Sequence, residues 1–130
     1  LTLHHGPPHL HRALTEASAC GVRWIVELLR EKGVPVTRFI ATGGLPHHDP
    51  DLVQIYADVL KETIQVPNTT QGPAVGAAIL GALAANAFPT TREAIEKMTS
   101  QATLTTYNPI NPEAYHSIYQ DYRQLAKTNS

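Results

Sequence analysis

Apolar residues near the start of the chain recur at the spacing of an amphipathic helix. They run from Leu10 to Leu28, and the charged side chains between them fall elsewhere on the helical wheel. The proline pair that begins at Pro7 suits a first helical turn, which has no use for its N–H groups. Gly33 is placed to end the helix in the left-handed conformation. The pattern therefore predicts one long helix from about Pro7 to Gly33.

The next pattern predicts a β-α-β unit. Residues 36–42 are rich in β-formers and are followed by two glycines, so they are expected to form a strand. Asp49 can cap a helix that begins at the following proline and runs to residue 60 or 61. Residues 63–66 alternate apolar and polar side chains and predict a second strand. A right-handed crossover would make the two strands parallel.

The second half of the chain predicts three further helices. Residues 74–85 are almost all small and apolar, Thr90 and Glu93 match a capping box, and a proline after Asn111 starts a last helix that carries several tyrosines on one face. Residues 99–110 are interpreted as a surface connection. The small side chains at 76, 77, 81, 82 and 85 imply that a neighbouring backbone or a ligand comes close. Tight packing of helix on sheet is the plainer of these two explanations.

Composition excludes several classes of function. The 130 residues contain 10 basic and 11 acidic side chains spread along the chain, so there is no charge signature for nucleic acid or an anionic membrane. The longest apolar stretch, residues 73–88, is shorter than the roughly 20 residues of a membrane span. One cysteine, Cys20, allows no internal disulfide and favours a reducing, cytoplasmic setting. The chain begins at Leu1, without Met, and is expected to be part of a longer polypeptide.

Metal and cysteine chemistry are poorly supported. Six of the seven histidines fall in two clusters, which are His4, His5, His9 and His11, and then His47 and His48. A metal site needs ligands fixed around the ion, and neither a terminal cluster nor a bare pair provides them. Cys20 lies in the middle of a predicted helix without an activating base nearby in the sequence. The sequence therefore predicts no metal site and no nucleophilic cysteine.

The glycine pair is the strongest candidate for a ligand site. In α/β sheets ligands bind where a strand ends and a helix begins, and glycine lets backbone approach them closely. Gly43 and Gly44 could also be an ordinary turn. Asp49 and Asp51 would repel a phosphate on the next helix, so a base or ribose suits this loop better. Neither GxxxxGK[ST] nor GxGxxG is present.

Several ordered motifs together resemble the carboxy-terminal domain of the FGGY carbohydrate kinases, and within that family the ribulokinases. They are Arg12-Ala-Leu-Thr-Glu-Ala17, Ile40-Ala-Thr-Gly-Gly-Leu45, Leu52-Val-Gln-Ile-Tyr-Ala-Asp58, Gln71-Gly-Pro-Ala-Val-Gly-Ala77, Tyr107-Asn-Pro109 and Tyr119-Gln-Asp-Tyr-Arg123. The similarity extends over nearly the whole chain. It implies an α/β fold, a partial ribonuclease-H-like domain of the actin-like ATPase and sugar kinase superfamily, with short parallel strands flanked by helices.

The resemblance also implies a site and its ligands. Gly43, Gly44 and Leu45 match the adenosine motif, and either His48 or Asp49 falls where these kinases often have an adenine-contacting Asn. An ionised Asp would replace that amide by an acceptor alone. The whole enzyme would use ATP with Mg²⁺. It would be a cytoplasmic protein and a possible homo-oligomer.

The resemblance implies as well that the catalytic Asp, the first phosphate loop and most of the site for the pentulose, expected to be L-ribulose, precede the residues matched here. The 130 residues, taken as one carboxy-terminal domain, are then expected to be inactive alone. The alternative is a non-catalytic α/β module used for packing or protein association.

Overall fold

The computed structural model describes residues 4–128, which fall into two compact units. The first unit comprises the residues up to 39, residues 50–64 and the residues from 107 on; the second comprises residues 40–49 and 65–106. Helices α1, α3, η1 and α6 belong to the first unit, while α2, α4, α5 and most of a three-stranded sheet belong to the second. No helix of residues 4–128 is long and apolar enough to cross a bilayer.

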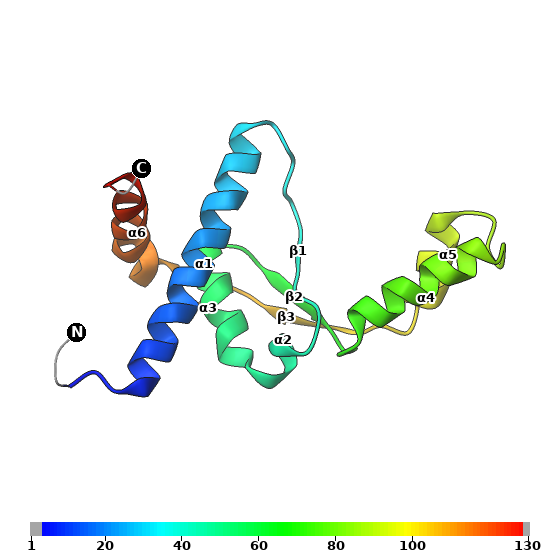
Figure 1. Ribbon diagram of the computed structural model, residues 1–130, viewed down its shortest axis with the longest axis horizontal. Helices are drawn as coiled ribbons and strands as arrows, with labels where there is room; N and C mark the ends of the chain where they lie inside the picture. Colours follow the sequence, from blue (N-terminus) through cyan, green and yellow to red (C-terminus); the bar gives the residue numbers. More distant parts are fainter. Residues whose placement is uncertain (1–3, 129–130) are drawn as a thin grey trace. The chain divides into compact units, whose positions relative to one another are not determined.

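Helix α1 spans Pro7–Glu31, which confirms the predicted long helix (Figure 1). Gly33 has φ +80°, and the amide of Val34 donates to the carbonyl of Leu29 at 2.9 Å. This is the 6→1 hydrogen bond of a Schellman motif, which glycine allows at no steric cost. The predicted left-handed cap is therefore confirmed.

The core of the first unit lies around α3 (Pro50–Leu60), which packs on α1 and on the short 3₁₀ helix η1 (Pro112–Tyr115). Helix η1 continues into α6 (His116–Thr128), which also contacts α1. The buried side chains of this core are Ala19, Cys20, Ile55, Val59, Tyr115 and Tyr119. Ala19 and Cys20 of α1 are small and share this cluster with the two tyrosines. The predicted apolar face of the last helix is confirmed for these tyrosines.

Strands β1 (Phe39–Ile40) and β2 (Ile64–Pro67) are neighbours in the sheet and are connected through α2 and α3. Thr42, two residues beyond β1, lies against Gly72, five residues beyond β2, which is consistent with the predicted parallel pair. The strand predicted over 36–42 was too long. The reason is that Arg30 donates two hydrogen bonds to the carbonyl of Val36, which keeps this segment out of the sheet.

A third strand, β3 (Leu104–Tyr107), completes the sheet in the order β1-β2-β3. The amide of Asn68 donates to the carbonyl of Thr103 at 2.9 Å, and Thr63 bonds Asn108 through their side chains at 3.0 Å. The residue numbers of the paired positions increase along one strand while those of their partners decrease along the other, so β2 and β3 are antiparallel. The interpretation of residues 99–110 as a surface connection was wrong for residues 104–107. This strand contains two exposed threonines, so it lacks the apolar pattern by which a strand is recognised.

Helices α4 (Gly72–Ala84) and α5 (Thr91–Met98) pack together in the second unit. The hydroxyl of Thr90 accepts a hydrogen bond from the amide of Glu93 at 3.2 Å, as the capping pattern predicted. The expectation of close packing at Gly76 and Gly81 was wrong, since a Cβ at either would meet no described atom within 4 Å. Ile79 is the one described residue of α4 that is buried, so most of this helix is open.

Candidate functional site

The predicted site begins where the backbone leaves β1. Gly43 has φ +96°, a conformation that L side chains rarely adopt, whereas Gly44 has an ordinary helical φ of −75°. The carbonyl of Gly44 accepts hydrogen bonds from the amides of His47 at 3.1 Å and His48 at 3.2 Å. The glycine pair leads directly into a four-residue helix, α2 (Leu45–His48), which the sequence analysis did not predict.

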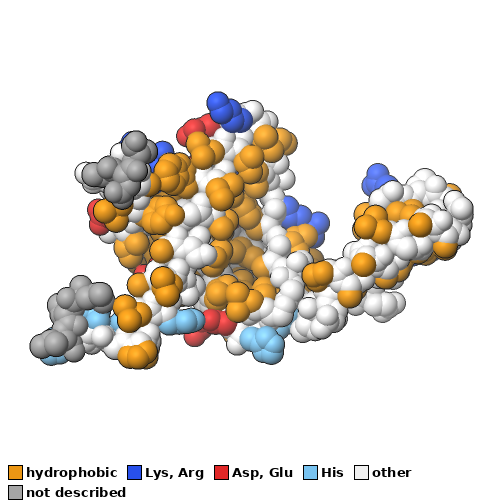
Figure 2. All heavy atoms as spheres, viewed as in Figure 1, with side chains coloured by type: hydrophobic (Ala, Val, Ile, Leu, Met, Phe, Trp, Pro, Cys, Tyr) orange, Lys and Arg blue, Asp and Glu red, His pale blue; other side chains and the backbone are white. Residues whose placement is uncertain are grey.

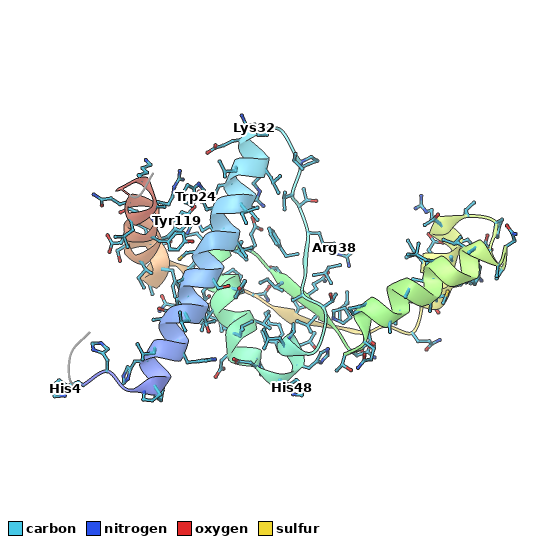
Figure 3. The ribbon with its side chains drawn as sticks, in the orientation of Figure 1. His4, Trp24, Lys32, Arg38, His48 and Tyr119 are labelled. Carbon is cyan, nitrogen blue, oxygen red and sulfur yellow. The ribbon has the colours of Figure 1, made fainter. Side chains whose placement is uncertain are left out.

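The five predicted site residues lie together in the segment from Gly43 to Asp49. Leu45 is 60% exposed, and the ring of His48 lies beside Gly44, whose added Cβ would be 3.8 Å from the Cδ2 atom of His48. Asp49 directly follows α2, and its amide donates to the carbonyl of Leu45 at 3.0 Å. His48 is therefore the candidate that borders the glycine pair, and it is labelled on α2 in Figure 3.

The backbone at Gly43 is open on the side where a side chain would project. A Cβ placed there would meet no atom within 4 Å, so no described side chain fills that space. An open left-handed glycine at a strand end can accept a flat ligand against the backbone. The assignment of these residues to nucleotide binding stays a prediction.

Residues beyond the sequence prediction hold this loop in place. The ring Nε2 of His47 forms a hydrogen bond with the carbonyl of Thr69 at 3.2 Å, and the amide of Gln71 donates to the Thr69 hydroxyl at 3.2 Å. A Cβ at Gly72 would lie 3.2 Å from the Cβ of Thr42, tighter than an ordinary contact. Glycine at position 72 therefore allows the start of α4 to approach the end of β1. No local pattern signals Thr69, since its role depends on a partner 22 residues away.

Metal and thiol chemistry have little support in the geometry. Among residues 4–128 no three His, Cys, Asp or Glu side chains are grouped to hold an ion. The side chain of His47 faces a carbonyl oxygen instead. Cys20 is fully buried, and burial raises the pKa of its thiol. The expectation that Cys20 is a buried residue of α1 is confirmed.

Solved structures define the class of fold to which this arrangement belongs. Xylulose kinase from Rhodospirillum rubrum superposes with a TM-score of 0.76 at 30% identity, over 98% of this chain and 26% of that one. Plasmodium falciparum glycerol kinase, solved with ADP, gives a TM-score of 0.69 at 18% identity, over 99% and 25% of the two chains. The chain has the α/β fold of the sugar kinase and actin-like ATPase superfamily, as the sequence predicted.

Sequence relatives then identify the family. Residues 1–85 match the sequence model of the FGGY family of carbohydrate kinases, C-terminal domain. Ribulokinase from Bacillus licheniformis is 38% identical over 130 residues, which cover 96% of this chain and 24% of the relative; that from Mycolicibacterium smegmatis is 40% identical over 117 residues, covering 88% and 20%. The chain belongs to the FGGY family of carbohydrate kinases and spans about a quarter of the length of these relatives.

Proposed function

We propose that this chain is the nucleotide-side part of an ATP-dependent carbohydrate kinase that phosphorylates a ketopentose, L-ribulose, to give the 5-phosphate for arabinose catabolism. The observation that carries the proposal is the open glycine loop at the end of β1, in a chain with 35–40% identity to ribulokinases. The reaction would transfer the γ-phosphoryl group of ATP to a hydroxyl of the pentulose. The whole protein is proposed to be cytoplasmic and a possible homo-oligomer.

In this proposal the described residues bind nucleotide and leave the chemistry to other parts of the polypeptide. Gly43, Gly44 and Leu45 would lie along the adenosine, and His48 or Asp49 would meet the adenine edge. Mg²⁺ would arrive on the phosphates of ATP, as it commonly does in kinases. Phosphoryl transfer depends on positioning and on charge stabilisation around the γ-phosphate. The 130 residues alone are therefore expected to be inactive.

Nucleotide titration tests the binding step. Addition of ADP or ATP to the isotope-labelled chain should shift the amide signals of Gly43 and Gly44, while Gly33, which caps α1 with a similar backbone conformation, should stay unmoved. A Gly43→Ala substitution should weaken the effect, because a side chain would occupy the open face of the loop. Equal shifts at Gly33 and Gly43 would contradict a specific site.

A kinase assay tests the reaction. The longest natural polypeptide that contains these residues should phosphorylate L-ribulose faster than xylulose or glycerol, and the 130-residue chain should phosphorylate none of them. Turnover by the short chain would refute the proposed division of labour. If the long polypeptide neither bound nucleotide nor phosphorylated a sugar, the alternative function would be favoured, a non-catalytic α/β module used for packing or protein association.

A further inference from the structure

A polar groove separate from the glycine loop runs between α1 and α6 in the first unit. Its volume is about 640 Å³. The lining side chains are Arg23, Glu27, His116, Tyr119, Gln120, Arg123, Gln124 and Lys127. Figure 3 shows the labelled residues Trp24 and Tyr119 lying between these two helices. Nearly all the groups that line the groove can donate hydrogen bonds.

Two guanidinium groups of the groove are held in position by their neighbours. The Cζ of Arg23 lies 4.0 Å from the centre of the Tyr119 ring, and this arginine also donates to the carbonyl of Val59 at 3.1 Å. The Cζ of Arg123 lies 5.4 Å from the centre of the Trp24 ring. Cations stacked on aromatic rings lose less freedom when a ligand binds, which favours binding.

One carboxylate links the two arginines without neutralising the groove. Glu27 accepts from Arg23 at 3.0 Å through one oxygen, and from Tyr119 at 2.6 Å and Arg123 at 3.1 Å through the other. Arg23 and Arg123 carry two positive charges against this single negative charge, so the three groups together keep a formal charge of +1. Although burial opposes ionisation of Glu27, its hydrogen bonds with Tyr119 and Arg23 keep its pKa below the ordinary value.

We infer that the α1–α6 groove binds a phosphate dianion, either inorganic phosphate or the phosphate of a small phosphomonoester. Each arginine keeps N–H groups beyond those that bond Glu27 and the carbonyl of Val59, and guanidinium N–H groups form charge-assisted hydrogen bonds with phosphate oxygens. The net positive charge of the two arginines and Glu27 also favours an anion. The amide Nε2 of Gln120 lies 2.9 Å from the ring Nε2 of His116, so these two side chains form a hydrogen-bonded pair in the lining of the groove. The volume exceeds that of a single phosphate, so an organic phosphate also fits. This site is independent of the proposed nucleotide loop, which belongs to the other unit.

Fluorescence of Trp24 provides a direct readout, because it is the one tryptophan in the chain and lies beside Arg123. Inorganic phosphate and glycerol phosphate would be titrated in parallel at constant ionic strength, with sodium chloride as the blank. Saturable changes with phosphate and none with chloride are expected. A response that is linear, or the same with chloride, would overturn the inference, since it would reflect screening alone.

Matched variants identify the residues responsible. Arg123→Gln should weaken phosphate binding by at least about tenfold, because it removes a charge-assisted donor. Lys127→Gln, at the end of the groove, tests the same site should Arg123→Gln unfold the chain. Arg92→Gln serves as the control, since Arg92 pairs with Glu96 on α5 in the other unit. Binding unaffected by the Arg123 and Lys127 substitutions would refute the site. Tighter binding of glycerol phosphate would assign it to an organic phosphate, and equal or weaker binding to inorganic phosphate.

Discussion

Gly43 and Gly44 are adjacent, yet only Gly43 has a backbone conformation that disfavours a side chain. At Gly43, φ is +96°, where an L residue costs about 1–2 kcal/mol. At Gly44, φ is −75° and the nearest atom to an added Cβ is 3.8 Å away. Gly43→Ala should therefore lower the free energy of unfolding by about 1–2 kcal/mol in urea denaturation, and Gly44→Ala by much less. Equal losses would show that the loop does not hold this conformation in solution.

Tyr119 should make the stability of the chain depend on alkaline pH. Burial raises its pKa to about 12, and the hydrogen bond to Glu27 acts in the same direction. The folded state thus holds the proton more tightly than the unfolded state, whose tyrosine titrates near 10. This contribution is fully present below pH 10 and is lost as pH rises toward 12. Tyr119→Phe should reduce the alkaline loss, measured as melting temperature between pH 9 and 12.

A comparison at neutral pH completes this test. Tyr119→Phe keeps the ring beneath Arg23 but removes a hydrogen bond to a charged group, which should cost about 1.5–3 kcal/mol. An unchanged alkaline profile in this variant would mean that other groups, such as lysines, set the pH dependence.

How far the sequence reveals the site depends on whether a residue acts locally. Gly43 could be identified because a strand followed by glycines is a local signal. The role of His47 could not be predicted, because its hydrogen-bond partner, the carbonyl of Thr69, comes close only in the folded second unit. The approach of Gly72 to Thr42 was hidden for the same reason.

At the scale of elements, the capping of α5 provides a sharp comparison of two adjacent threonines. The hydroxyl of Thr90 caps the helix by accepting from the amide of Glu93, whereas Thr91 is the first helical residue. Thr90→Ala should reduce the free energy of unfolding by about 0.5–2 kcal/mol. Thr91→Ala should leave it unchanged or raise it slightly, since alanine is the better helix former. Thermal denaturation of both variants measures the difference, and the opposite order would show that Thr90 does not act as the cap.

Helices were predicted better than strands because their signals are local. Gly33 marked the end of α1, but α3 and α4 end with Lys61 and Asn86 in the left-handed conformation, at φ 58° and 55°. Neither Lys nor Asn signals the end of a helix in a sequence as strongly as glycine does. Strand β3 has no alternation of apolar and polar residues, since its pairing with β2 is decided by backbone hydrogen bonds. Strand β2 was nevertheless predicted within one residue, whereas β3 and the short helix α2 were not predicted.

At the scale of the whole molecule, α1 carries apolar side chains on more than its packed face. Thr15, Ala19, Cys20 and Val26 are buried, yet Leu14 is 72% exposed and Ile25 is 58% exposed. Figure 2 shows hydrophobic side chains gathered along this helix. Helix α1 therefore carries an exposed apolar face in addition to its packed face and its charged face. The family match fixes the fold, whereas this exposed face bears on how the chain behaves in isolation.

The isolated chain should associate with itself through this face of α1, since large exposed apolar patches drive association. Sedimentation of the purified chain should show a weight that rises with protein concentration, and Leu14→Glu with Ile25→Glu should reduce the rise. Both side chains are mostly exposed, so the double variant should keep its free energy of unfolding within about 0.5 kcal/mol of the parent for each change. Leu80→Glu is the matched control, because Leu80 is equally exposed but lies on α4. If Leu80→Glu abolished association and the α1 double variant left it unchanged, the contact would lie on α4 and not on α1.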